Sequence, residues 1–563
     1  MRKMKTLKIY FIALLVIMGA SNCSDEFLER TPSDQISSAT FFKQQKDIEY
    51  ALNAVYDLIG FNSWNRSYGS GTDMLRIEVL TDNAVDHHSW NACYELGNGT
   101  ANSYDWYVQY RWQERYRGIM RANRLLEGAP NVEDMDLDYR NRLVAEATVL
   151  RAYFYFDLVY LFGDVPYLTS SILPDDCEPL VDADGNVTPN PSCNRTDKDV
   201  VMDALIADLE AVVAHLPKSY EQDNKGRITQ GTALTLQARI HLFREEWTEA
   251  AAASKAVMDL NVYSIYPTYA NMFDYQGVDN QEVIFDIQVM EEVNEGEFWL
   301  PNYGPNSVGG WSCSCPLQSL IDTYETTDGK TIDDPTSIYD PAQPYANRDP
   351  RLHHSILYPG REWQWGVYNS IPGATYPGED VVAGDDLTDG TGGQWNKSAT
   401  GYNWIKYISQ QDVDNSNYWD SGIHFIVMRY AEVLLMYAEA KLEAGDIDQS
   451  VYDAINEVRQ RGDVNMPAIT TGKSVDQLRE IIRRERRVEF TFEGIRLYDI
   501  RRWKIAEDVM PGESEGLSYT DPDTGNEVTL SGGVRNFDPA KHYLWPIPQA
   551  EIDVSGLPQN PNW

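Results

Sequence analysis

Apolar residues recur every three or four positions along much of the first half of the chain. This spacing puts them on one face of a helix and predicts a helix from residue 145 that Gly163 and Pro166 end. The same spacing predicts helices over 197–216, 229–244 and 246–259. Because a very short turn separates the last two, the pattern favours stacked helical hairpins of the tetratricopeptide type.

The middle of the chain, from about 262 to 425, has a different pattern. Gly, Pro, Asn, Asp and aromatic residues are frequent there, and helical runs are short. Residues 279–289 and 403–409 are rich in β-branched and aromatic residues, which predicts two strands. We expect long loops in the rest of this region.

Helical spacing returns at residue 429 and continues to about 510. It predicts a helix that ends near Gly445, a partner helix over 448–461, and a third helix that begins at the capping box Ser474 to Gln477. Two carboxylates lie on the apolar face of that third helix among several arginines, so we expect ion pairs with neighbouring helices. Residues 519–533 are predicted to form a β-hairpin, and the Pro-rich end of the chain is predicted to be extended.

The first forty residues follow a separate pattern. Four basic residues precede a short apolar run, 9–20, and Cys23 follows before an acidic stretch. A membrane-spanning helix needs roughly 20 apolar residues, so the run is typical of a signal peptide, and its Cys indicates a lipoprotein. A lipoprotein signal normally has Leu and a small residue where this chain has Ala20 and Asn22, which leaves an ordinary secretory signal as the alternative. We predict a signal peptide over 1–22, lipidation at Cys23 and a tether over 23–40.

Charge narrows the classes of partner. The chain has 47 Lys and Arg against 86 Asp and Glu, a formal charge of −39. Such a surface repels nucleic acid and anionic membranes, so the lipid is the expected membrane contact. Five of the six cysteines remain if Cys23 is acylated, and Cys177 and Cys193 flank a loop that a disulfide would close.

Six stretches of sequence together resemble the SusD/RagB family of outer-membrane lipoproteins of the Bacteroidetes. They are AEATVLRAYFYFDLVYLFGDVP, ETTDGK followed by NRDPRL, MRYAEVLLMYAEAKLEAG, AINEVRQRG, RRERRVEFTFEGIRLYDIRRW, and LWPIPQAEI followed by LPQNPNW. The resemblance implies a mainly α-helical globule with four tetratricopeptide-like hairpins, an irregular ligand-binding part with short strands, and no cofactor. It also implies capture of a glycan at the extracellular side of the outer membrane and delivery to a SusC-like TonB-dependent transporter.

The resemblance also suggests how the chain is divided. One SusD-like domain is expected over 41–563. Its helical scaffold covers 41–260 and 426–510, its loop-rich ligand-binding part covers about 262–425, and an extended segment covers 511–563. The charged residues of the family motifs are expected to form ion pairs and to pack helices rather than to touch ligand: Arg429, Glu432, Glu439, Glu485, Arg486, Glu489 and Arg501.

Candidate ligand-binding residues follow from the chemistry of sugars. A sugar ring offers an apolar face, which suits indole and phenol rings, and hydroxyls, which suit Asp, Asn and Arg. An early segment brings several such residues together: Arg76, Asp82, Asn83, Asp86, Trp90 and Asn91. The central region adds two further clusters: Trp299, Tyr303 and Trp311, and then Trp363, Trp365 and Trp395. Trp311 follows two glycines in a family motif, so a role as a core anchor stays open.

Other chemistries have weaker support. The adjacent pairs His87–His88 and His353–His354 are poorly spaced to ligate one metal ion, and 182–187 is predicted to be a tight turn rather than a calcium loop, so no metal is expected. A glycan-degrading enzyme would need two carboxylates across one bond, and no motif marks such a pair. Capture of peptides by the same family of proteins remains an alternative.

Overall fold

The computed structural model describes most of the chain after residue 40. The predicted signal peptide, Cys23 and the tether lie outside the described residues, as do Trp365 and Trp395. The described ranges are 41–59, 74–171, 177–181, 187–221, 224–291, 296–363, 366–372, 396–522 and 524–563.

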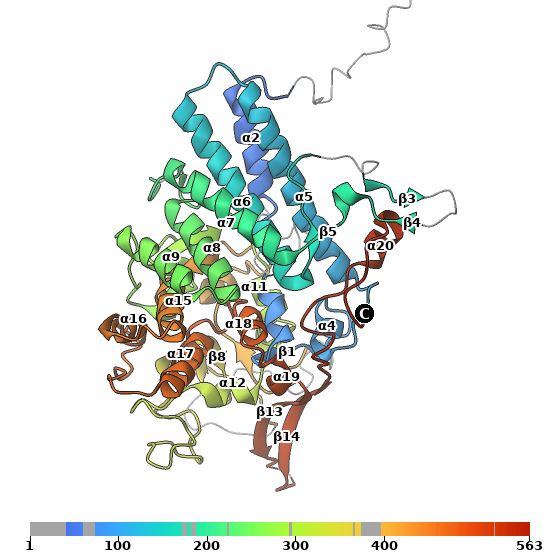
Figure 1. Cartoon of the computed structure of the whole chain (residues 1–563). Coiled ribbons are helices and arrows are strands. Elements are labelled where there is room, and N and C mark those ends of the chain that lie inside the picture. The colour runs from blue at the N-terminus through green and yellow to red at the C-terminus, as the bar shows by residue number, and fades with distance from the viewer. Residues whose placement is uncertain are drawn as a thin grey trace, which may run out of the picture.

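Long helices form the N-terminal part of the molecule (Figure 1). They are α2 (Gln45–Tyr56), α5 (Trp106–Gly128), α6 (Leu137–Phe162) and α7 (Lys198–Val212). Helix α6 packs against α5 on one side and α7 on another, and α2 contacts both α5 and α6. The predicted end of α6 is confirmed, since its C-cap is Gly163 with φ +75°, a conformation that glycine adopts without strain.

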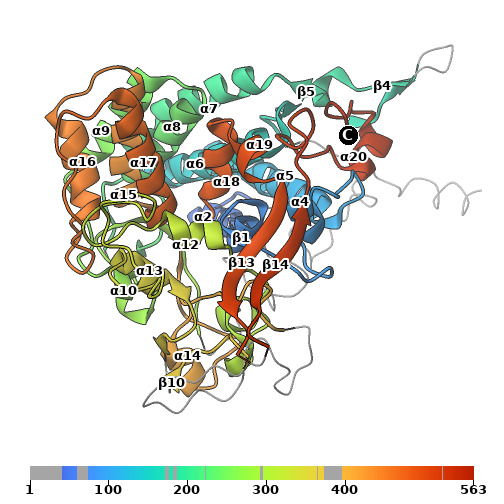
Figure 2. The ribbon, with the colours of Figure 1, turned by 90° about the horizontal axis from the view of Figure 1, so that it is seen from below.

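Helices from the two halves of the chain pack against each other. The pair α8 (Gln230–Phe243) and α9 (Trp247–Asp259) confirms the predicted hairpin. Helix α9 also packs on α15 (Tyr430–Glu443), which contacts α16 (Gln449–Arg459) and α17 (Val475–Glu489). Figures 1 and 2 both show these early and late helices side by side. The observed helices and their order confirm a mainly helical fold, whereas the tetratricopeptide type of the hairpins stays a prediction.

Helix α17 begins as its sequence predicts. The Ser474 hydroxyl accepts the backbone N–H of Gln477, and the Gln477 side chain accepts the N–H of Ser474, which completes the capping box. The predicted apolar face, with Leu478, Ile482 and Val488, is buried. The capping box therefore sets the start of the helix and helps to hold its buried face in register.

Buried ion pairs join α17 to its neighbours, as predicted. Glu489 accepts hydrogen bonds from Arg351, Arg429 and Arg461, each at 2.7 Å. Glu485 accepts from Arg351 and from Arg459, both at 2.6 Å. These partners come from three other parts of the chain, so the network holds the middle region against the C-terminal helices.

Arg501 differs from the other family-motif residues. Glu432 pairs with Arg239, Glu439 with Arg502, and Arg486 with Asp499, all as expected. Arg501 instead donates from Nη2 to the backbone carbonyl of His542 at 3.3 Å. Among the described residues its Nη1 has no hydrogen-bond partner. The prediction of an ion pair for this residue is wrong.

The middle region contains short strands, as expected, but one prediction was too long. Strand β6 (Val283–Ile287) is confirmed and pairs antiparallel with β12 (Phe425–Arg429). In 403–409 only β11 (Asn403–Trp404) is a strand, paired with β8 (Ile356–Leu357). The backbone turns at Tyr407, where φ is +65°, and the buried Lys406 ammonium pairs with Glu493. A tertiary ion pair therefore replaced the predicted strand pairing.

The predicted C-terminal hairpin is confirmed and is longer than expected. Strands β13 (Gly512–Thr520) and β14 (Glu527–Arg535) pair antiparallel with two register shifts. The hairpin projects from the lower end of the molecule in Figure 1. It follows α18 (Arg496–Arg502) and α19 (Ala506–Val509). It precedes α20 (Gln549–Ser555), a helix in the Pro-rich end that was predicted to be extended, so that prediction is wrong for these residues.

Short elements complete the described part of the chain. The helices are α4 (Tyr94–Asn98), α10 (Tyr269–Met272), α11 (Trp299–Tyr303), α12 (Gln318–Thr323), α13 (Pro350–Ser355) and α14 (Gln410–Asp414). The strands are β1 (Ala84–Val85), β2 (Val165–Pro166), β3 (Leu180–Val181), β4 (Val187–Thr188), β5 (Arg195–Thr196), β7 (Cys315–Pro316), β9 (Glu362–Trp363) and β10 (Gly366–Val367).

Two further features bear on the compartment. Cys177 and Cys193 form the disulfide that their spacing suggested, a bond typical of oxidising environments. Within the described ranges, the apolar stretches of the helices are too short or too charged to cross a bilayer.

Candidate ligand-binding site

A two-residue strand pair brings the early polar segment against the central aromatic region. Strand β1 pairs antiparallel with β7, with Val85 opposite Cys315. The N–H of Leu317 donates to the carbonyl of Asn83 at 2.9 Å and extends this contact. As a result, residues 86–91 and residues 299–314 lie next to each other although more than two hundred positions separate them.

A tight turn places Trp311 at this junction. Gly309 has φ +91°, and a Cβ on Gly310 would lie 2.0 Å from the carbonyl oxygen of Gly304. The N–H of Trp311 donates to the carbonyl of Pro301 at 2.8 Å. Only glycines fit this close return of the backbone, so the two glycines before Trp311 set where its indole lies.

Three tryptophans from three separate segments meet here, and we call Trp90, Trp311 and Trp419 the tryptophan cluster. The ring centroids of Trp90 and Trp311 are 6.0 Å apart, and those of Trp311 and Trp419 are 5.4 Å apart. Trp90 exposes 52% of its surface and Trp419 exposes 51%, while Trp311 is half-buried between them. Water therefore reaches two large indoles, one on each side of Trp311.

Trp419 was not among the residues predicted from the sequence. It follows α14 in a polar loop that is fastened by hydrogen bonds between the backbones of Glu297 and Ser421, at 2.8 and 3.0 Å. Its ring packs edge-on against Phe298 at 5.3 Å. The signal in the sequence was a tryptophan among Asn, Ser, Asp and Gly, a composition typical of exposed loops.

Buried polar side chains precede and follow Trp90 in the early segment. Asp86 accepts the backbone N–H of His88 at 2.8 Å, and the ring of His88 lies 5.1 Å from that of Trp90. Asp86 and His88 are buried, and burial raises the pKa of Asp86. Arg76 and Asn91 are also buried, and the Asn91 side chain accepts the N–H of Ala92 at 2.8 Å. Of the early segment, Trp90 is therefore the predicted residue whose side chain is widely exposed.

Two groups of side chains could hold a cation. Asp86, His87 and His88 form one, and Asp279, Asp286 and His424 form the other; in each group three possible ligand atoms lie within 4.8 Å of one another. The sequence did not predict either group. In both, a histidine already contacts a carboxylate: His88 Nδ1 lies 3.3 Å from Asp86 and His424 Nδ1 lies 2.9 Å from Asp286. These contacts explain the grouping without a metal ion.

Asp82 and Asn83 have structural partners, which corrects their prediction as ligand contacts. Asp82 accepts two hydrogen bonds from Arg496, both at 2.8 Å, and lies 3.1 Å from Arg487. These arginines hold the pKa of Asp82 well below its usual range despite its burial. Asn83 donates to Glu78 at 2.7 Å and accepts from Arg487 at 2.8 Å.

Three predicted aromatic residues lie in the core, so their prediction as stacking platforms is also corrected. Trp299 is fully buried, donates from Nε1 to the carbonyl of Ile423 at 3.1 Å, and stacks on Tyr407 at 4.9 Å. Tyr303 is 1% exposed and packs on Phe492, and Trp363 is 7% exposed. Trp365 and Trp395 lie outside the described residues.

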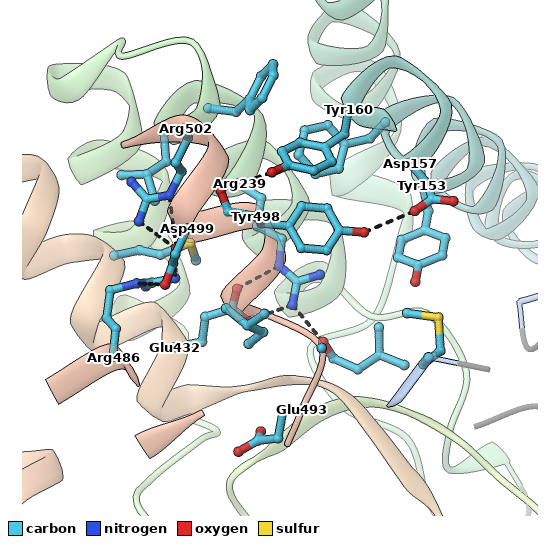
Figure 3. A pocket seen from close by; sticks show the side chains of 18 of the residues that line it. Tyr153, Asp157, Tyr160, Arg239, Glu432, Arg486, Glu493, Tyr498, Asp499 and Arg502 are labelled. Atoms are coloured by element: carbon cyan, nitrogen blue, oxygen red, sulfur yellow. Dashed lines mark hydrogen bonds and ion pairs between the residues drawn. The ribbon is translucent and has the colours of Figure 1, made fainter. Parts of the chain in front are cut away.

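A cavity between α6, α8, α15 and α18 is a different kind of space (Figure 3). Its volume is about 60 Å³, room for a few water molecules. Charged pairs line it, among them Arg239 with Glu432 and Arg502 with Asp499. The Tyr498 hydroxyl also donates to Asp157 at 3.0 Å. This cavity is too small for a sugar ring and belongs to the packing of the scaffold.

The fold and the site define a class: a helical scaffold whose irregular loops present an exposed cluster of aromatic rings. Sequence comparison assigns the family. A profile described as the SusD family matches residues 281–563, half of the chain, and one described as starch-binding associating with outer membrane matches 26–242. The chain belongs to the SusD family, as its motifs predicted.

Curated relatives match over most or all of their length. A SusD-like protein P2 of Formosa agariphila is 27% identical over 586 aligned positions, which cover 100% of both chains. A SusD-like protein of Bacteroides ovatus is 25% identical, with 88% of this chain and 82% of the relative aligned.

Solved structures show the same fold. A SusD-like carbohydrate-binding protein from Bacteroides fragilis superimposes with a TM-score of 0.78 and 29% identity, covering 92% of this chain and 99% of the other. A surface glycan-binding protein A from Bacteroides thetaiotaomicron, solved in complex with laminarihexaose, has a TM-score of 0.66 at 18% identity, with 92% and 100% coverage. At that identity the second likeness concerns the fold alone.

Proposed function

We propose that this chain binds a glycan at its tryptophan cluster. One observation carries the proposal: two indoles, each half-exposed, lie beside a third at the junction of three loops. An aromatic patch of this kind gains free energy when an apolar surface covers it, and the C–H face of a sugar ring provides such a surface. Exposed Asn415 and Ser416 in the Trp419 loop offer polar groups for the sugar hydroxyls.

The relatives support the same class of ligand. The structural neighbour from Bacteroides fragilis is described as carbohydrate-binding, and one family profile is described as starch-binding. The arrangement of the site fits binding rather than catalysis, because Asp82 is held in ion pairs and Asp86 is buried beside His88. We therefore propose a binding protein and not an enzyme.

The affinity should be modest. Association costs roughly 4–15 kcal/mol before any contact yields net binding free energy. Two or three indoles each contribute on the order of 1 kcal/mol beyond the burial of their apolar surface. We expect dissociation constants between about 1 μM and about 1 mM. Calorimetric titration of the purified protein against a panel of neutral glycans would measure them.

Single substitutions test the position of the site. Trp90→Ala and Trp419→Ala should each weaken glycan binding about tenfold, since each removes a stacking face. Trp106→Ala is the matched control because Trp106 is 53% exposed but lies outside the cluster, at the start of α5. If no glycan binds while a pool of peptides does, or if Trp106→Ala weakens binding as much as Trp90→Ala, the proposal fails.

We further propose that the chain is a lipoprotein on the extracellular face of the outer membrane, where it passes ligand to a SusC-like TonB-dependent transporter. The family description of outer-membrane association and the lipoprotein signal before Cys23 support this. Co-purification with a co-expressed transporter of this type would test it. If this chain were recovered without the transporter from a membrane fraction that contains both proteins, the partnership would be contradicted.

A further inference from the structure

A large cleft on another part of the molecule has an unusual charge. It has a volume of about 860 Å³ and lies where the ends of α6 and α18 meet the start of α7, the α8–α9 turn and the C-terminal segment. Figure 2 shows α18, α19 and the C-terminal segment next to one another. Of the described residues that line it, seven are Arg or Lys and four are Asp or Glu, although the whole chain has a formal net charge of −39. We call it the basic cleft.

Arg501 is the central cation of the basic cleft. Its side chain lines the cleft and exposes 8% of its surface. Its one hydrogen bond to a described residue runs from Nη2 to the His542 carbonyl, and Nη1 has no partner in the described part of the chain. Burial lowers the pKa of Arg501, and the groups that oppose the shift are the hydroxyls of Tyr160, Tyr498 and Tyr543 rather than carboxylates. A buried guanidinium in these surroundings lacks the anion that normally compensates it.

Two lysines add further positive charge to the cleft. Lys504 lies 4.4 Å from the centre of the Tyr543 ring, and Lys541 lies 4.0 Å from the centre of the Trp563 ring. Neither forms an ion pair with a carboxylate of the described residues. Burial lowers the pKa of Lys504, and the nearby charge of Arg501 adds to this effect, while Glu245 and Glu507 oppose it without forming an ion pair. The cations of the cleft therefore repel one another and would be stabilised by an anion.

Other charges around the cleft are already satisfied. Arg502 pairs with Glu439 and Asp499, and Arg244 pairs with Asp203 and Glu246. Arg195 donates to the carbonyls of Asp164 and Pro558, at 2.8 and 3.0 Å, and to the Asn560 side chain. Of the acidic residues in the lining, Asp199 pairs with Lys198 and Glu246 pairs with Arg244. Arg501 and Lys541 form no ion pair with a carboxylate of the described residues.

We propose that the basic cleft binds the anionic groups of an acidic oligosaccharide, a sugar that carries carboxylate, sulfate or phosphate. The volume lies within the 300–1,000 Å³ range that is typical of small-molecule sites, and it is much larger than one inorganic anion needs. Phe243 and Tyr543 provide aromatic walls beside the cations. The saccharide nature of the ligand rests on the proposed function, whereas its negative charge follows from the cleft itself.

The test uses the purified full-length protein and probes that differ only in charge. Chondroitin sulfate oligosaccharides, their desulfated form and their desulfated, carboxyl-reduced form would be titrated by calorimetry, with inorganic sulfate and phosphate as competitors. We expect affinity to fall in that order and to weaken as NaCl increases, because the attraction is ionic. Equal affinity for the charged and the carboxyl-reduced forms, or binding of none of the anionic probes, would overturn the proposal.

Variants identify the cations. Replacing both lysines, Lys504→Gln with Lys541→Gln, should weaken binding of the sulfated probe about tenfold or more, since each removes a charge-assisted contact. Lys473→Gln is the control, because Lys473 is exposed and lies outside the cleft. Arg501→Gln should have at least as large an effect. If that variant melts too early to be measured, the double lysine variant decides, and unchanged affinity there would contradict the proposal.

The two sites are distinguishable. Trp90→Ala should weaken binding of neutral glycans and leave binding of inorganic sulfate unchanged, whereas the double lysine variant should do the reverse. Loss of neutral-glycan binding in the lysine variant, with its melting temperature unchanged, would mean that the basic cleft is not a separate anion site. Failure of all neutral glycans to bind, with sulfate still bound, would contradict the proposed function and leave the charge argument standing.

Discussion

Residues of one type reach different environments in this protein. Trp299 is buried and hydrogen-bonded to the Ile423 carbonyl, Trp363 is 7% exposed, and Trp90 is 52% exposed. The local sequence separates them only in part: Trp299 lies between Phe298 and Leu300, whereas Trp363, which is also buried, lies among polar residues as Trp90 does. The segments that fold over them decide their exposure, and with it their capacity to stack on a ligand.

Gly310 should matter for both stability and binding. A Cβ at this position would lie 2.0 Å from a backbone oxygen, so Gly310→Ala should shift the turn, cost about 1–3 kcal/mol of unfolding free energy, and move Trp311. Gly472→Ala is the control, since Gly472 has φ +91° but open space around its Cβ position. Chemical unfolding and glycan titration should show lost stability in both variants and lost affinity in Gly310→Ala only. Equal affinities would show that Trp311 does not contribute to binding.

Asp412 should make stability depend on pH. Burial raises its pKa to about 6, although the Tyr275 hydroxyl donates to it at 2.6 Å. Because the folded-state pKa lies above the unfolded value, this carboxyl contributes most to stability below about pH 4, and the contribution is lost as the pH rises through 6. Asp412→Asn should therefore raise the unfolding free energy by about 3 kcal/mol at pH 8 and change it little at pH 4. Urea titrations at the two pH values would measure this, and an equal change at both would contradict it.

At the scale of elements, α17 links the two parts of the fold. Its capping box fixes where it begins, its apolar residues face the core, and its two buried glutamates bind arginines from α13, β12 and the α16 region. A helix this rich in charged residues packs stably because each buried carboxylate has several cationic donors. The element therefore depends on residues far from it in sequence.

Glu489→Gln should be strongly destabilising. The carboxylate accepts from three arginines, which hold its pKa well below its usual range. Removing its charge leaves buried guanidinium groups uncompensated, at a cost of about 3–5 kcal/mol. Because the folded-state pKa of Glu489 is depressed, its carboxylate stabilises the fold above its unfolded-state pKa, near 4, and this stabilisation is lost on acidification. The loss of stability in Glu489→Gln should therefore shrink at low pH.

The exposed Glu480 on the same helix provides the control for that variant. Glu480→Gln should change the unfolding free energy by less than about 0.5 kcal/mol. If urea unfolding at pH 7 gave similar values for the two variants, the buried network would not be stabilising.

At the scale of the whole molecule, charge is distributed unevenly and the two proposed sites lie apart. The chain is strongly acidic, yet cations gather in the basic cleft between the N-terminal helices and the C-terminal segment. The tryptophan cluster lies elsewhere, where three loops meet. Arg535 of the C-terminal hairpin supports the early loop near that cluster by donating to the carbonyls of Thr81 and Ala84.

The predicted anchor applies to the whole molecule as well. If Cys23 is acylated, metabolic labelling with a fatty acid should mark the natural protein and should fail for Cys23→Ser. Each buried CH₂ of an acyl chain contributes about 0.8 kcal/mol to membrane binding, so the variant should also leave the membrane fraction. Label retained on Cys23→Ser would show that the lipoprotein prediction is wrong.

Much of the scaffold could be predicted because its signals are local. Helix spacing, Gly163 as a C-cap and the Ser474 capping box all act within a few residues, and the structure has each of them. The strand predicted over 403–409 was too long because Lys406 pairs with Glu493, about ninety positions away. Of the predicted site residues, Trp90 and Trp311 lie in the cluster, whereas Asp82 and Trp299 have partners in the core.

The sequence by itself determined the family, the mainly helical class, the acidic surface and the type of residue a ligand site would use. These follow from composition, periodicity and motifs, which are properties of short stretches. Only the tertiary structure decided that Trp419 joins Trp90 and Trp311 and that Asp82 is committed to Arg496. It also decided that Arg501 faces a basic cleft without a carboxylate partner among the described residues. Exposure and pairing depend on contacts between distant segments, and a one-dimensional pattern carries little information about them.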